Sequence, residues 1–179
     1  MPELAFEKSK ASQPLPYKIK IRNTRVAAPF EGKAFVYRLP NNQWETDFYH
    51  EWFAYPRDLI TESCIAALNH SGQFKAVTSE DSLMDADYYL EATLNALYLD
   101  RRDQDHSDAV LEIRWLLIEH NSPVNPKSTG ELWNQTYRVI QGLKSDTHQA
   151  YADAIAEALK KVLEQLIVDV SGKIASTSP

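Results

Sequence analysis

Cysteine and glycine are both scarce in this chain, and each scarcity excludes a kind of chemistry. The 179 residues include one cysteine and five glycines. A single cysteine, Cys64, cannot form a disulfide within the chain and cannot build a thiolate-rich metal site. No glycine lies in a GxGxxG or GxxxxGK run, so the backbone loop that holds nucleotide phosphates is missing. The sequence therefore excludes an internal disulfide and carries no nucleotide-binding motif.

Long apolar runs and an excess of positive charge are also lacking. No apolar run approaches the roughly 20 residues that a membrane-spanning helix requires. The formal net charge is -6, whereas nucleic-acid binding needs clustered lysine and arginine, so we expect no nucleic-acid partner. The opening residues, MPELAFEKSK, lack the apolar stretch and cleavage site of a secretory signal. We interpret the chain as either cytoplasmic or a mature domain without its leader, and not as a membrane-spanning protein.

Motifs for catalysis and metal binding are missing as well. The five histidines are scattered, and none pairs with another histidine or a carboxylate at metal-ligand spacing on a predicted element. His50, in the sequence HEW, lacks the second histidine of a metalloprotease motif. Cys64 has apolar neighbours on its predicted helix, which is typical of a buried cysteine. We expect no metal, no cofactor and no enzyme activity, and a hydrolase with a dispersed site is the least favoured alternative.

Length and composition indicate one folded domain. The hydrophobic share of 44% and the charged share of 25% are ordinary for a folded protein, and no change in composition divides the chain. The first residues are rich in proline and show no apolar period. We predict a flexible N-terminal arm over residues 1–16, a single domain over residues 17–174 and a flexible tail over residues 175–179.

Apolar periodicity predicts an α+β fold. Alternating apolar residues predict strands over 17–23, 33–39, a short segment ending at 48, 74–77, 86–103, 108–120 and 131–140. Helical spacing predicts a first helix from Pro56 to about Asn69 and a second from a cap at Asp146 or Thr147 to about Gly172. This order does not alternate as a parallel βαβ chain would. The simplest arrangement is a mainly antiparallel sheet with both helices packed on one face.

The stretch ADYYLEATLNALYLDRRD, residues 86–103, is expected to be one long strand with two unlike faces. Alternate residues from Tyr88 to Tyr98 form an unbroken apolar row, which predicts the face toward the core. The opposite row is polar in the middle but carries Tyr89, Leu97 and Leu99 near its ends. This is more apolar surface than a solvated face requires, so we expect something to cover those ends.

Aromatic residues are concentrated in the segment WETDFYHEWFAYP, residues 44–56. Large amphipathic rings serve both cores and interfaces. For any single ring, sealing the sheet edge against the first helix is the favoured interpretation. For the group as a whole, we expect some rings to be exposed in a binding surface.

The order of these patterns resembles a known family. The segments FVYRL, DFYHEWFAYPRDLITESCIAAL, SGQFKAV, ADYYLEATLNALYLDRRD and DAVLEIRWLLI, followed by an amphipathic helix, resemble the ABC-type transport auxiliary lipoproteins, the PqiC-like family. The resemblance runs from about Tyr17 to Ile174. It consists of aromatic and aliphatic positions in a set order, without a catalytic signature.

The resemblance implies a fold, a location and a set of partners. Members are periplasmic lipoproteins tethered to the outer membrane, which act with an ABC transporter and an MCE-domain protein to move lipids or other hydrophobic molecules between membranes. It also implies a fold like the N-terminal domain of TolB. The lipid-bearing cysteine of the mature N-terminus is not in this sequence, and Cys64, inside a helix, cannot replace it. Either the leader and the lipid-bearing cysteine have been removed, or this member is not lipidated.

We therefore expect a non-catalytic accessory subunit that docks an MCE-domain protein. An alternative is a periplasmic carrier that holds a lipid tail in a hydrophobic cleft, and a homo-oligomer would also explain the additional apolar surface. The residues predicted to bind the partner come from the aromatic segment and from the second face of the long strand: Tyr37, Asp47, Tyr49, Trp52, Phe53, Tyr89, Leu97 and Leu99.

Overall fold

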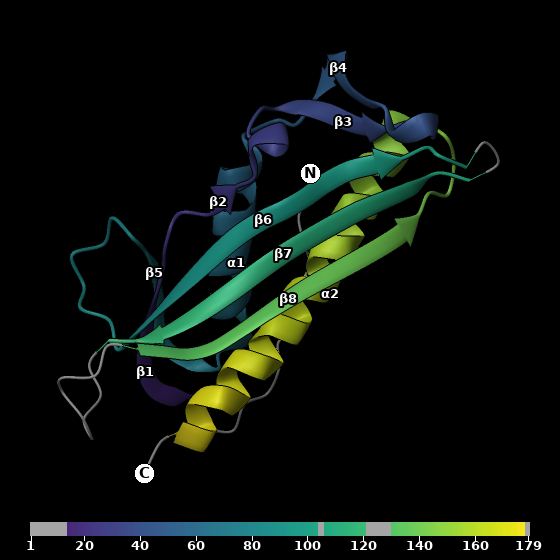
Figure 1. Cartoon of the computed structure of the whole chain (residues 1–179). Coiled ribbons are helices and arrows are strands. Elements are labelled where there is room, and N and C mark those ends of the chain that lie inside the picture. Colours follow the sequence, from purple (N-terminus) through teal and green to yellow (C-terminus); the bar gives the residue numbers. More distant parts are fainter. Residues whose placement is uncertain (1–13, 104–105, 121–129, 178–179) are drawn as a thin grey trace.

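The computed structural model describes residues 14–103, 106–120 and 130–177. Within these ranges, eight strands form one sheet, accompanied by two α-helices (Figure 1). In chain order, the elements are β1 Leu15–Ile21, β2 Arg25–Val26, β3 Ala34–Arg38, β4 Trp44–Glu51, α1 Pro56–Ser71, β5 Phe74–Ser79, β6 Tyr88–Asp100, β7 Asp108–Glu119, β8 Gly130–Gly142 and α2 His148–Thr177, with short 3-10 turns η1 Ala28–Phe30 and η2 Pro40–Asn42.

Strand β6 is the centre of the sheet and pairs directly with four other strands along its two sides. On one side, β7 and then β8 add antiparallel strands. On the other side, β1, β2 and β3 pair in parallel with successive parts of β6. The sheet is completed by β5, parallel to β1, and by β4, antiparallel to β3. Because the antiparallel pairs contain most of the paired residues, the predicted mainly antiparallel α+β fold is confirmed, with short parallel pairings added.

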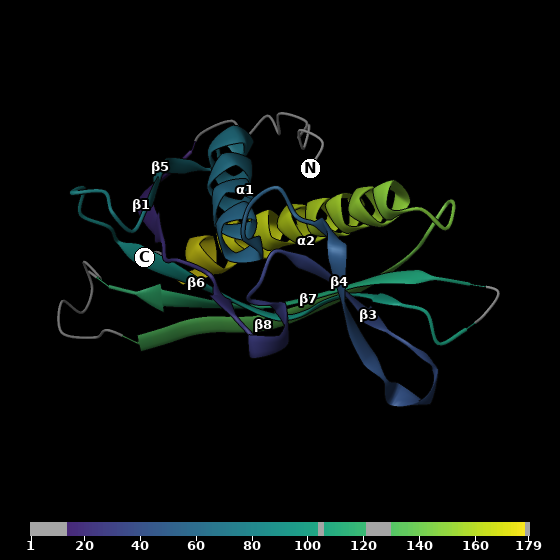
Figure 2. The same cartoon turned by 90° about the horizontal axis from the view of Figure 1, so that it is seen from above.

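Both helices pack on the same face of the sheet, as predicted (Figure 2). Helix α1 begins with Pro56 and ends before Gly72, which has a φ of 64° and so adopts the left-handed conformation that glycine tolerates. Helix α2 is capped by Thr147, whose Oγ1 accepts a hydrogen bond of 3.1 Å from the backbone N–H of Ala150. The apolar stripe of α2 is buried against β7 and β8.

The ends of the folded domain differ from the prediction. Helix α2 continues past Gly172 to Thr177, so most of the tail predicted over 175–179 is helical. Ile174 is fully buried, and its burial offsets the roughly 1 kcal/mol that a glycine costs inside a helix. Strand β1 begins at Leu15, inside the predicted arm. Residues 1–13 of that arm lie outside the described residues, as do residues 121–129, between the strands predicted over 108–120 and 131–140.

A β-bulge in β6 changes which residues face the helices. The pairing of β6 with β7 shifts by one residue between Leu94 and Ala96, so Asn95 is an extra residue in the strand. Side chains after the bulge point to the faces opposite to those of simple alternation. Leu97 and Leu99 are therefore buried in the core, at 4% and 1% exposure. Their predicted place on the second sheet face is wrong.

Candidate functional site at the β4 edge

Strand β4 lies at an edge of the sheet and carries exposed aromatic side chains. In the path β4-β3-β6-β1-β5 it is the first strand, and Figure 2 shows its hairpin with β3 extending to the side of the sheet opposite the helices. Phe48 is 93% exposed, Tyr49 91% and Phe53, just after the strand, 89%. Rings this exposed contribute little to folding, so they form a candidate interaction surface. We call Phe48, Tyr49 and Phe53 the edge aromatics.

Two other aromatic residues that were predicted to bind the partner, Trp52 and Tyr37, do not belong to this exposed surface. Trp52 is 4% exposed and packs with ring centroids 4.6 Å from Phe35 and 5.5 Å from Tyr151. Tyr37 is also buried, and its hydroxyl donates a hydrogen bond to Asp47. Trp52 and Tyr37, both predicted to bind the partner, are therefore core residues in this structure. Partner binding by Tyr49 and Phe53 stays a prediction.

Tyr89 lies far from the edge aromatics, at the other end of β6. This end of β6 pairs with β1, whereas β3 pairs with the end that contains Leu99. The Tyr89 ring is half-buried between His120, with ring centroids 4.8 Å apart, and the guanidinium of Arg22, at 4.8 Å from the ring centroid. The predicted partner-binding residues thus do not form one continuous surface.

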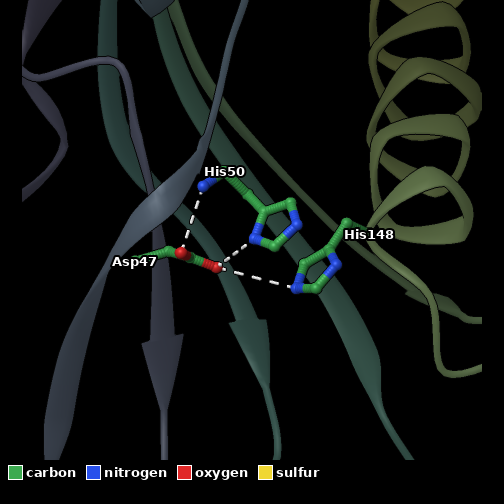
Figure 3. Close-up of side chains that lie close together, drawn as sticks. All are labelled: Asp47, His50 and His148. Carbon is green, nitrogen blue, oxygen red and sulfur yellow. Dashed lines mark hydrogen bonds and ion pairs between the residues drawn. The ribbon is translucent and has the colours of Figure 1, made fainter.

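Three polar side chains meet between β4 and the start of α2 (Figure 3). Asp47 lies in β4 with its side chain 10% exposed. Its Oδ2 is 2.9 Å from Nδ1 of His50 and 3.6 Å from Nε2 of His148, the first residue of α2. The two imidazole rings stack with centroids 3.4 Å apart and an interplanar angle of 11°. The group therefore links the edge strand to the helix layer.

Hydrogen bonds hold the Asp47 carboxylate in place. Its Oδ1 accepts bonds from the backbone N–H groups of Tyr49 at 2.8 Å and His50 at 3.1 Å, while the Tyr37 hydroxyl donates to Oδ2. Burial raises the pKa of Asp47, but these hydrogen bonds outweigh burial and leave its pKa well below the ordinary range. Burial and the neighbouring carboxylate raise the pKa of Tyr37. Asp47 is thus a carboxylate at neutral pH, and Tyr37 remains a donor.

Sequence reasoning did not find this group. The histidines were not predicted to bind a metal, and the segment after Phe48 was not predicted to be strand. Asp47, His50 and His148 each offer one ligand atom, and these atoms all lie within 4.8 Å of one another. The local signal was an aspartate three residues before a histidine. His148 joins Asp47 and His50 only because β4 and the start of α2 come into contact in the folded chain.

An aromatic groove lies on the second face of the sheet. The turn η1 and the β3–β4 hairpin cover one end of that face, where the Tyr98 ring lies 6.3 Å from Phe30 and 5.0 Å from Trp44, measured between centroids. The groove beside them has a volume of about 680 Å³ and includes Arg38 and Arg138 among its polar residues. Trp44 lines this groove, and 51% of its surface is exposed. One end of the second face is therefore covered by the chain itself.

The sequence profile of a family described as ABC-type transport auxiliary lipoprotein component matches residues 3–167. The chain belongs to this family. No protein among the curated ones matches it in sequence. Because the family is one of auxiliary components, membership is consistent with a protein that is not an enzyme, implies action with a transport system and suggests a location in the cell envelope. Neither helix in the described ranges combines the length and apolar character needed to span a bilayer.

Solved structures share the fold of this family member. Protein XCC0632 from Xanthomonas campestris, of the family DUF330, aligns with a TM-score of 0.84 and 18% identity over 99% of this chain and 97% of its own. The hypothetical protein CT253 from Chlamydia trachomatis aligns with a TM-score of 0.65 and 8% identity over 91% of this chain and 100% of its own. These TM-scores establish a common fold, and identities this low carry no statement about partners.

Proposed function

We propose that this protein is a non-catalytic accessory lipoprotein that docks an MCE-domain protein of an ABC transport system through the edge aromatics. In this proposal the protein acts in the periplasm, is tethered to the outer membrane by an N-terminal lipid, and helps to move lipids or hydrophobic molecules between the membranes. The observation that carries the proposal is the exposure of Phe48, Tyr49 and Phe53 on and beside one edge strand. Membership of the auxiliary family supports the transport role.

The geometry of β4 suits a docking edge. The pairing of β4 with β3 is interrupted by a bulge between Thr46 and Glu51, and Phe48 and Tyr49, which lie in this bulge, are both exposed. The outer side of an edge strand offers backbone N–H and C=O groups to a partner, and aromatic side chains supply specific contact area. The hydrogen bonds to Asp47 hold the backbone of this segment in place, so partner binding would cost little conformational entropy there.

Removing the edge aromatics is expected to weaken partner binding. For Phe48→Ala and Phe53→Ala we expect the dissociation constant for the MCE-domain protein of the same operon to rise about 10-fold or more each, because central aromatic contacts dominate interfaces. Isothermal titration calorimetry with the purified proteins measures the change. Leu83→Ala is the matched control, since Leu83 is fully exposed, at 102%, outside the docking surface.

Two results would contradict docking through β4. One is unchanged affinity of a Phe48→Ala, Tyr49→Ala, Phe53→Ala triple variant whose circular dichroism matches that of the wild type. The other is an equal loss of affinity in Leu83→Ala. Because edge strands also pair with second copies of the same chain, the mass of the protein alone is measured by ultracentrifugation, and self-association lost in the triple variant would assign the edge to a homo-oligomer.

The aromatic groove favours a second candidate function, a lipid carrier. Its volume of about 680 Å³ falls in the range of about 300–1,000 Å³ that is common for small-molecule sites. A carrier should retain lipid when it is purified from membranes in mild detergent. Native mass spectrometry that finds lipid on the wild type and not on Trp44→Ala would support the carrier. A lipid-free spectrum together with partner binding would favour docking alone.

A further inference from the structure

We propose that Asp47, His50 and His148 form a binding site for a zinc ion, which joins the edge strand β4 to the start of α2. Two imidazole nitrogens and one carboxylate oxygen are a ligand set that zinc accepts, with a fourth position left for water. Imidazole is a poor ligand for the hard cations calcium and magnesium, which favour oxygen. The site does not depend on docking of an MCE-domain protein.

Two of the three separations between the ligand atoms suit a tetrahedral ion, and all three atoms lie within 4.8 Å of one another. Because the two imidazole rings are stacked, one of them would have to rotate for both nitrogens to bind the same ion. Zinc bonds to nitrogen and oxygen of about 2.0–2.1 Å place neighbouring ligand atoms about 3.3 Å apart in a tetrahedron. Oδ2 of Asp47 lies 2.9 Å from Nδ1 of His50 and 3.6 Å from Nε2 of His148, so the two separations bracket that value. Figure 3 shows the two rings each directing a nitrogen toward the same carboxylate oxygen.

The surroundings of Asp47 resemble the outer shell that metal ligands need. The backbone N–H groups of Tyr49 and His50 bind Oδ1, which leaves Oδ2 directed at the imidazoles. The Tyr37 hydroxyl adds a buried donor that fixes the carboxylate from the core side. Such partners orient a ligand before the ion arrives.

The site is open on its solvent side. The side chains of His50 and His148 are 44% and 38% exposed, so an ion can enter without unfolding the edge. Of the three ligands, two come from β4 and one from α2, and a bound ion would therefore cross-link elements that are distant in sequence.

Zinc binding to tag-free protein tests the proposal. Isothermal titration with zinc chloride is expected to show one site per chain in the wild type. His50→Gln and His148→Gln should each weaken binding by about 10- to 100-fold or more, since loss of an outer-shell partner alone costs that much. His106→Gln is the matched control, because His106 Nε2 also faces a carboxylate oxygen, Oδ1 of Asp108, at 2.9 Å. The zinc affinity of this variant should equal that of the wild type.

Cobalt substitution supplies a second measurement. Cobalt in a near-tetrahedral site with nitrogen ligands absorbs strongly in the visible, and this absorption should appear in the wild type and be lost in both glutamine variants. The proposal is overturned if the wild type binds no zinc, or if His50→Gln and His148→Gln bind it as tightly as His106→Gln does. His50 is an exposed residue of the edge strand, so its variant keeps the test valid even if His148→Gln is destabilised.

Discussion

Replacing Trp52 with alanine is expected to lower the free energy of unfolding by about 3 to 5 kcal/mol, the range for removing a buried tryptophan or phenylalanine. Trp52 follows β4, where it fills the space between Phe35 and Tyr151 at 4% exposure. Its loss leaves a cavity between the edge of the sheet and α2. Since domains are stable by only about 5–15 kcal/mol, the variant would lose much of its stability.

Urea unfolding followed by circular dichroism measures this effect, and Phe53→Ala is the matched control. Phe53 is the next residue in the chain and is 89% exposed, so its truncation should change the unfolding free energy by about 0.5 kcal/mol or less. A Trp52→Ala variant as stable as Phe53→Ala would mean that the Trp52 ring belongs to the surface and not to the core.

This pair of neighbours shows where sequence reasoning reaches its limit. Both residues are large aromatics in one crowded segment, and a short strand that ends in a turn does not repeat often enough to establish which side each ring takes. The segment was correctly predicted to contain both core and exposed rings. Which ring is which depends on the path of the chain from β4 into α1.

The architecture was more predictable, because it rests on longer patterns. Strand β7 alternates as expected, with Ile113, Trp115 and Leu117 all fully buried. The stripe of α2 repeats over many turns, and its burial followed directly from the helical period. Strands were also predicted over 33–39 and in a short segment ending at 48, where β3 and β4 lie. Long periodic segments average out local irregularities, which short segments cannot do.

The zinc ligands illustrate a second limit. Asp47 and His50 are close in sequence, but the third ligand comes from the start of a helix that follows most of the sheet. No spacing rule for metal ligands within one element includes such a residue. The site becomes visible only when β4 and α2 are placed side by side, as in Figure 3.

Leu97 gives the second large expected effect, and it tests the bulge in β6. Leu97→Ala should lower the free energy of unfolding by about 2 to 5 kcal/mol, because a buried leucine loses its contacts and leaves a cavity. The side chain is 4% exposed and lies with Ile60 of α1 and Ile155 of α2 under the helix layer. Chemical denaturation of the purified variants measures the change.

Asn95→Ala is the control that separates the bulged strand from simple alternation. In an unbroken strand, Asn95 and Leu97 would share one face, two residues apart. In the structure, Asn95 is exposed and lies with Ala96 beside the aromatic groove, whereas Leu97 faces the helices. Asn95→Ala should therefore lower the free energy of unfolding by about 0.5 kcal/mol or less. If both substitutions were equally mild, the strand would continue without a bulge, and Leu97 would return to the second face of the sheet, where it would be available to a lipid or a partner.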